Sequence, residues 1–131
     1  FFSDSKKSNV SIFDYEKETG ELSNKKIIFQ TLRSEYGSPD GLCLDNNDNL
    51  WIGLWDGSAI IQIDQKGDLI KKIKLPAKKI TTLCFGGREL NDIYINSAGA
   101  DNLDLNGKLA GALFHINIGI RGKKEYRSRF E

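Results

Sequence analysis

The chain has 131 residues, of which 39% are hydrophobic and 28% charged, the balance of a soluble globular domain. Nineteen Lys and Arg residues against eighteen Asp and Glu residues leave a formal net charge of +1, which argues against binding of nucleic acid or of an anionic membrane through a charged surface. No apolar run approaches the ~20 residues that a membrane-spanning helix needs. We therefore expect neither nucleic acid nor a membrane as a partner.

The chain opens on Phe1 in a strand-like apolar start, so we expect the natural N-terminus and any signal peptide to lie upstream. Two cysteines, Cys43 and Cys84, are too few for a disulfide scaffold. Each lies in a short apolar run, where a free thiol behaves as a small buried hydrophobe. This pattern fits a reducing compartment and predicts a cytoplasmic protein with both thiols buried.

Short runs of β-branched and aromatic residues, separated by turn-forming clusters, follow one another along the chain. The apolar runs are residues 27–29, 50–52, 60–63, 70–75 and 93–95, and the turn clusters are residues 37–41, 45–49, 65–68 and 86–87. Helical periodicity is almost absent. The pattern predicts an all-β fold of antiparallel strands.

These strands repeat as a set. Two apolar strands that begin at residues 42 and 50, with a polar turn between them, return at residues 83 and 93. Residues 59–64 likewise return at residues 112–117. A unit of about 40–45 residues with four strands is typical of a β-propeller blade. The alternative, an immunoglobulin-like sandwich, does not explain the repeat. The chain therefore predicts two and a half to three blades of four-stranded antiparallel sheet.

Several spaced motifs carry a resemblance to a known family. Ser-Pro-Asp-Gly-Leu-Cys-Leu-Asp at residues 38–45, followed by Asn-Leu-Trp-Ile-Gly at residues 49–53, resembles a motif of the regucalcin (senescence marker protein) and gluconolactonase family. Similar segments are residues 2–5, 13–24, 81–87, 93–98 and 111–122. The stretch from residue 97 resembles the insect members somewhat more, and luciferin-regenerating enzyme belongs to the same family. The resemblance implies a six-bladed propeller, in which residues 1–131 form the C-terminal part of a single domain and the N-terminal half is a missing partner.

The same resemblance implies a metal site. The family holds one divalent cation, often Ca²⁺ or Zn²⁺, with Mg²⁺ or Mn²⁺ as further options, through a Glu, an Asn and the Asp of Pro-Asp-Gly. Only that Asp maps onto this chain, at Asp40, as a metal ligand and, in catalysis, as a general base. From the residues alone, the preferred interpretation of Asp40 is a structural turn aspartate, and the resemblance to the family reverses that preference. Trp55 is expected to line the channel mouth as a substrate-binding residue, whereas Trp51 is expected to pack between blades.

The function that the resemblance implies is metal-dependent hydrolysis of a sugar lactone or a related ester. Three alternatives stay open: a calcium-binding regulatory propeller with little turnover, an enzyme of the luciferin-regenerating type, and a non-enzymatic propeller that binds other proteins. Because the other metal ligands are expected outside the chain, we predict that the 131 residues alone are inactive.

Three further features have structural interpretations. Residues 45–49 mimic the start of a calcium-binding EF-hand loop, but Leu50 stands where that loop needs Gly, so we interpret them as a strand-to-strand turn. His115 is the only histidine and is expected to point outward from a strand. The basic pairs, such as Lys6-Lys7, are expected in solvated turns or strand ends, and residues 101–104 in a loop between strands.

Overall fold

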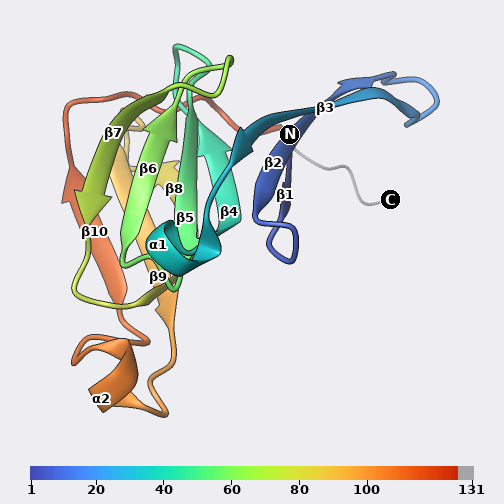
Figure 1. Cartoon of the computed structure of the whole chain (residues 1–131). Coiled ribbons are helices and arrows are strands. Elements are labelled where there is room, and N and C mark those ends of the chain that lie inside the picture. Colours follow the sequence, from blue (N-terminus) through green and yellow to red (C-terminus); the bar gives the residue numbers. More distant parts are fainter. Residues whose placement is uncertain (127–131) are drawn as a thin grey trace.

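The computed structural model describes residues 1–126, which form ten strands and two short helices in three antiparallel sheets (Figure 1). The first sheet contains β1 (Phe2–Asp4), β2 (Asn9–Tyr15) and β3 (Leu22–Gln30). The second contains β4 (Ser38–Leu44), β5 (Leu50–Trp55), β6 (Ala59–Ile63) and β7 (Leu69–Lys74). The third contains β8 (Lys79–Gly86), β9 (Asp92–Ala98) and β10 (Leu113–Asn117). Helix α1 (Arg33–Tyr36) links the first two sheets, and α2 (Leu103–Asn106) lies between β9 and β10.

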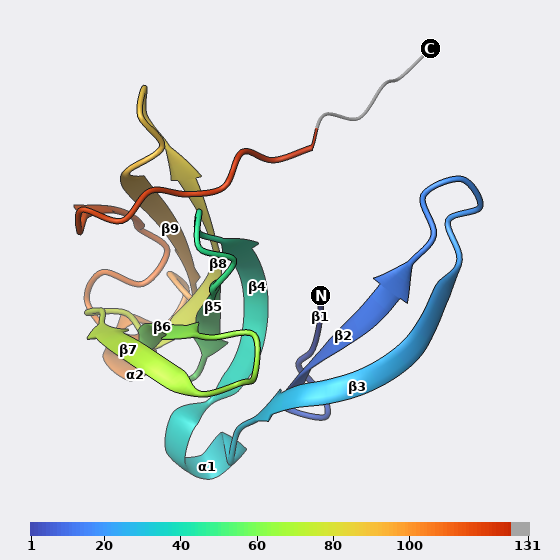
Figure 2. The same cartoon turned by 90° about the horizontal axis from the view of Figure 1, so that it is seen from above.

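The three sheets stand side by side in an open arc, with β4 between β1 and β8 (Figure 2). Each sheet is a meander whose strands pair in chain order. The repeat in the sequence is confirmed, because β4, β5 and β6 of the second sheet recur as β8, β9 and β10 of the third. The fold is therefore all-β and part of a β-propeller, and we call the three sheets blades one, two and three.

The core lies between neighbouring blades. Ile52 and Leu54 of β5 pack toward blade one, whereas Trp51 packs toward blade three, where its ring meets Phe85 edge-on at 6.1 Å between centroids. Blade two is covered on both faces, which is why β5 is a continuous apolar run rather than an alternating one. The prediction that Trp51 packs between blades is confirmed.

The segment after β10 crosses the ends of β4 and β8 that lie opposite α1 (Figures 1 and 2). Gly122 forms an antiparallel bridge with Asp45, and its amide donates to the carbonyl of Leu90 at 2.7 Å. Lys123 donates its amide to the carbonyl of Leu44 at 3.0 Å, and its ammonium group pairs with Asp48. We call residues 121–123 the closing segment.

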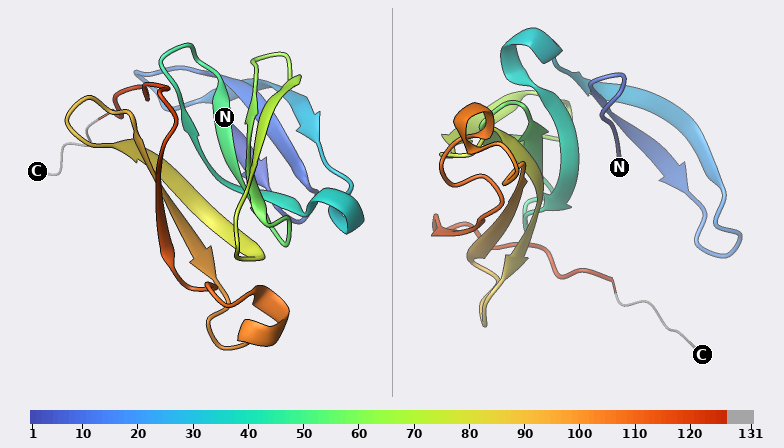
Figure 3. Two further views of the ribbon diagram at one scale, coloured as in Figure 1. Left: turned by 90° about the vertical axis from the view of Figure 1, so that its left-hand side faces the viewer. Right: turned by 90° about the horizontal axis from the view of Figure 1, so that it is seen from below.

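One burial prediction is wrong. Cys43 is buried, but Cys84 is exposed. The two cysteines occupy equivalent places, because Cys43 pairs with Trp51 and Cys84 with Tyr94 in the same register. Cys43 is covered by blade three, whereas no described blade covers the face of blade three that carries Cys84 (Figure 3).

The polar loop expected at residues 101–104 contains the start of α2, where the side chain of Asn102 accepts a hydrogen bond from the amide of Leu105. Asparagine is a favoured residue at this position before a helix, so one helical turn forms inside the loop. His115 points outward as predicted, with its side chain 54% exposed and stacked on Tyr94. No helix in residues 1–126 is long and apolar enough to cross a membrane.

Candidate functional site

The Pro-Asp-Gly sequence forms a bulge in β4. Pro39 pairs with Leu54 and Leu42 with Ile52, so Asp40 and Gly41 together face a single residue of β5. An extra residue of this kind re-aims the side chains around it, and proline is tolerated because β4 is an edge strand. Gly41 is required by close packing, since a Cβ there would lie 2.5 Å from the hydroxyl oxygen of Thr82 on β8. The motif thus fixes Asp40 at the inner edge of blade two.

Asp40 and Trp55 line the same cavity, which encloses about 290 Å³. The other lining residues are Ser5, Lys6, Arg33 and Ser38. They come from the β1–β2 turn, α1, the start of β4 and the end of β5, which gather at one end of the blades (Figure 1). The structure therefore brings together the two site residues that the sequence singled out.

Three hydrogen bonds fasten blade one to blade two around this cavity. The hydroxyl of Ser5 donates to the carbonyl of Pro39 at 2.8 Å, and the hydroxyls of Ser8 and Ser38 lie 3.0 Å apart. Thr31 donates its hydroxyl to the carbonyl of Gly37 at 2.8 Å, which ties the α1 loop to the start of β4. The cavity wall is thus held by both blades.

The carboxylate of Asp40 is half-buried, and burial raises its pKa. Among residues 1–126 no group donates a hydrogen bond to it and no Lys or Arg lies within 4.0 Å of it. A partly buried carboxylate without a donor is a suitable ligand for a cation. The same residues hold no cluster of three or more His, Cys, Asp or Glu side chains that could bind a metal. Asp40 thus fits a metal as one ligand, and the described residues do not complete the set.

Lys6 and Arg33 are the charged lining residues that sequence reasoning missed. Lys6 was expected to be a solvated turn residue, and it is exposed, but it also faces the cavity. Their proximity to Asp40 depends on the contact between blades one and two, so no local pattern in the sequence could have revealed it. Lys79 does not line the cavity, but its ammonium lies 5.1 Å from the centroid of the Trp55 ring.

Asp45 has a structural role, and the interpretation of residues 45–49 as a turn is confirmed. Its buried carboxylate accepts hydrogen bonds from the amides of Asn47 and Asn49, at 2.9 and 3.0 Å, and from the side chains of Asn49, Trp51 and Gln62, at 3.2, 3.1 and 2.7 Å. Burial raises the pKa of this carboxyl, but the hydrogen bonds outweigh it and lower the pKa overall. Hydrogen bonds from the protein satisfy this carboxylate, so we do not interpret Asp45 as a ligand for a cation.

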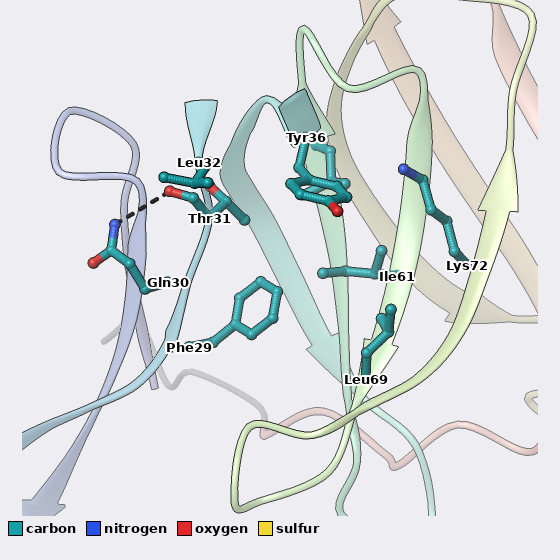
Figure 4. A pocket seen from close by; sticks show the side chains of 9 residues that line it. Phe29, Gln30, Thr31, Leu32, Tyr36, Ile61, Leu69 and Lys72 are labelled. Carbon is teal, nitrogen blue, oxygen red and sulfur yellow. Dashed lines mark hydrogen bonds between the residues drawn. The ribbon is translucent and has the colours of Figure 1, made fainter. Parts of the chain in front are cut away.

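A second cavity, of about 310 Å³, lies between β3 of blade one and β6 and β7 of blade two, next to α1 (Figure 4). Its walls are mostly apolar, with Phe29, Leu32, Ile61 and Leu69 among them, and its one cation, Lys72, lies 5.2 Å from the ring of Tyr36. It contains no carboxylate, histidine or cysteine. The cavity beside Asp40 is therefore the better candidate for chemistry.

Comparisons with known proteins identify the family and agree with the fold. The family model for the SMP-30/Gluconolactonase/LRE-like region matches residues 1–99. Regucalcin from Danio rerio is 37% identical over 131 residues, which cover 96% of this chain and 44% of that protein. The chain thus spans less than half the length of the curated relatives that it matches.

Two solved structures show the same fold. A luciferin-regenerating enzyme is 30% identical with a TM-score of 0.80, over 92% of this chain and 41% of the enzyme. The calcium-binding protein regucalcin from Agrobacterium tumefaciens is 22% identical with a TM-score of 0.84, over 97% of this chain and 44% of that protein. Because the family model covers most of its length, this chain belongs to the SMP-30/gluconolactonase/LRE-like family.

Proposed function

We propose that this chain supplies part of the active site of a metal-dependent hydrolase that opens sugar lactones, with Asp40 as a metal ligand. One observation carries the proposal. The Asp40 carboxylate lines a cavity next to Trp55, its pKa is raised by burial, and no hydrogen-bond donor in residues 1–126 satisfies it. Family membership supports the reaction type, since gluconolactonases belong to the same family.

Asp40 and Trp55 have separate roles in the proposed reaction. When bound, a divalent cation polarises the lactone carbonyl and stabilises the negative charge that develops on its oxygen. Asp40 would be one of the ligands that hold that cation. Asp40 would also be the carboxylate that accepts a proton from the water that attacks the carbonyl. Trp55 offers an aromatic surface against which a sugar ring can pack.

We propose that the remaining blades of the propeller are the partner of this chain. Ca²⁺ takes six to eight oxygen ligands and Zn²⁺ about four, so Asp40 alone cannot hold either ion tightly. Large apolar side chains on the outer faces of blades one and three, such as Phe2 and Leu113, are exposed. Exposed apolar faces of this kind fit a neighbouring blade. On its own, the chain is expected to be inactive.

The test compares Asp40→Asn with Asp64→Asn in the completed propeller. Asp64 is a matched turn aspartate, which accepts hydrogen bonds from the amides of Lys66 and Asp68 and does not line the cavity. We expect Asp40→Asn to lower kcat/KM for a sugar lactone by about 100-fold or more. It should also abolish tight binding of one metal equivalent, measured by calorimetry, whereas Asp64→Asn changes neither. Full turnover and metal binding in Asp40→Asn would refute the assignment.

A second candidate is a calcium-binding propeller with little turnover. It is favoured by the structural likeness to the Agrobacterium tumefaciens protein, which is described as calcium-binding. The same experiment separates the two candidates. Calcium binding that depends on Asp40, without hydrolysis of any lactone in a panel, would support the second candidate over the first.

A further inference from the structure

The cavity beside Asp40 carries two cations that no ion pair within the described residues neutralises. Lys6 and Arg33 both line it, and neither lies within 4.0 Å of a carboxylate in residues 1–126. The neighbouring Lys7 differs, because its ammonium lies 3.7 Å from the carboxylate of Asp4 and its side chain does not line the cavity. Lys6 and Arg33 are therefore available to a ligand.

Both cations are attached to parts of the backbone that are fastened to blade two. Lys6 follows Ser5, whose hydroxyl bonds to the carbonyl of Pro39, the residue before Asp40. Arg33 begins α1, and the loop around α1 ends at Gly37, where an added Cβ would lie 2.3 Å from the carbonyl oxygen of Trp55. The placement of the two cations relative to Asp40 thus follows from direct contacts between blades one and two.

The balance of charge in the cavity favours an anionic ligand. Two cations, Lys6 and Arg33, line the cavity together with a single carboxylate, Asp40. A neutral lactone would leave these charges unmatched, and a metal bound by Asp40 would add more positive charge. A carboxylate or phosphate group on the substrate would match them, because Arg and Lys form charge-assisted hydrogen bonds with both anions.

We propose that this cavity selects substrates that carry a carboxylate or phosphate group, and that Lys6 and Arg33 bind that anion. The inference rests on the proposed lactone hydrolysis and narrows its substrate class to anionic sugar lactones. Lys6 and Arg33 act as specificity-determining residues, and Asp40 remains the group that acts at the carbonyl.

The test measures binding first, with probes that contain no lactone. The 131-residue chain contains Lys6, Arg33 and the other described residues that line the cavity. It is titrated by calorimetry with an uncharged alditol, the same alditol carrying a phosphate, and the corresponding aldonate. We expect at least one of the two anionic probes to bind about tenfold or more tightly than the alditol. Added salt should weaken the binding of that anionic probe and leave the binding of the uncharged alditol unchanged. The two anionic probes distinguish a phosphate from a carboxylate as the preferred group.

Variants then test whether Lys6 and Arg33 are the residues that bind the anion. Lys6→Ala and Arg33→Ala should each weaken the preferred anion about tenfold, whereas the matched control Lys7→Ala should not. Lys6→Arg and Arg33→Lys, which keep the charge, should retain most of the binding, and circular dichroism of each variant checks that the sheets are intact. Equal affinity for all three probes, or equal losses in Lys6→Ala and Lys7→Ala, would overturn the proposal.

Hydrolysis in the completed propeller separates this inference from the proposed function. A higher kcat/KM for a phosphorylated or acidic sugar lactone than for its neutral counterpart, lost in Lys6→Ala, supports both. Anion binding that depends on Lys6 and Arg33, without turnover of any lactone, supports the anion site and contradicts the hydrolase. Turnover that favours neutral lactones supports the hydrolase and overturns the anion site.

Discussion

The indole Nε1 of Trp51 donates a hydrogen bond to Oδ2 of Asp45 at 3.1 Å, and both side chains are fully buried. This bond joins the turn before β5 to the packing between blades two and three, because the Trp51 ring also packs edge-on with Phe85 of blade three. The polar turn and the apolar core of blade two are therefore coupled through one carboxylate.

Replacing that carboxylate should destabilise the fold. In Asp45→Asn, the new amide group is a donor and faces other donors, so at least one buried hydrogen bond is lost. We expect the free energy of unfolding in urea to fall by about 3 kcal/mol. The control Asp64→Asn alters an exposed turn that is otherwise similar, and its effect should be clearly smaller. Equal losses in the two variants would contradict the buried role of Asp45.

The contribution of Asp45 should also depend on pH. Its pKa is lower in the folded state than in the unfolded state, where it is about 3.9. The stabilisation is therefore fully present above about pH 4 and is lost as the pH falls through the folded-state pKa. Urea midpoints at pH 7, 5, 4 and 3 should show the gap between wild type and Asp45→Asn narrowing at the acid end. A gap that stays constant down to pH 3 would be inconsistent with this linkage.

Replacing Asp40 should affect stability in the opposite direction to replacing Asp45. Because burial raises its pKa, the ionised carboxylate opposes folding at neutral pH, and Asp40→Asn removes that cost. In a metal chelator at pH 7, we expect the Tm of Asp40→Asn to equal or slightly exceed that of the wild type, measured by circular dichroism. A marked decrease would indicate that Asp40 is a structural turn residue.

The two thiols should differ in reactivity. Burial, reinforced by the nearby Glu125, raises the pKa of Cys43 to about 12, so its reactive thiolate is scarce at pH 8. Cys84 is exposed. We expect iodoacetamide to label only Cys84 in the native chain, as located by peptide mass spectrometry, and both thiols in urea. The Cys84→Ser variant should take up no label until it is unfolded. Labelling of Cys43 at a comparable rate would show that blades two and three separate.

A substitution at Gly122 tests how tightly the closing segment packs against β8. Gly122 lies against Phe85, and a Cβ at this position would be 2.1 Å from the Cβ of Phe85. Gly122→Ala should therefore displace residues 121–123 and lower the free energy of unfolding by about 2 kcal/mol. The control Lys124→Ala, at an exposed site two residues further along, should have little effect. Unchanged stability in Gly122→Ala would mean that the segment is not held against β8.

The blade repeat could be predicted because strands and turns have local signatures, and Trp51, Asp40 and Trp55 stood out within it. The exposure of Cys84 could not be predicted, because its apolar run resembles that of Cys43. The two thiols differ in exposure only because a neighbouring blade covers Cys43. The partners of Asp45 were equally hidden, because Gln62 comes from the next strand. Local sequence defines the strands, whereas the contents of the cavity depend on how the blades meet.

The closing segment also has a consequence for the order of events during translation. Lys123 pairs with Asp48, 75 residues earlier, and the neighbouring backbone bonds join the same two regions. At a synthesis rate of roughly 5–20 residues per second, Lys123 leaves the ribosome about 4–15 seconds after Asp48. Throughout that interval the carbonyl of Leu44 and the amide of Asn46 lack the partners they have in the finished protein. A nascent chain paused before residue 121 would therefore expose this end of β4 to proteases and chaperones.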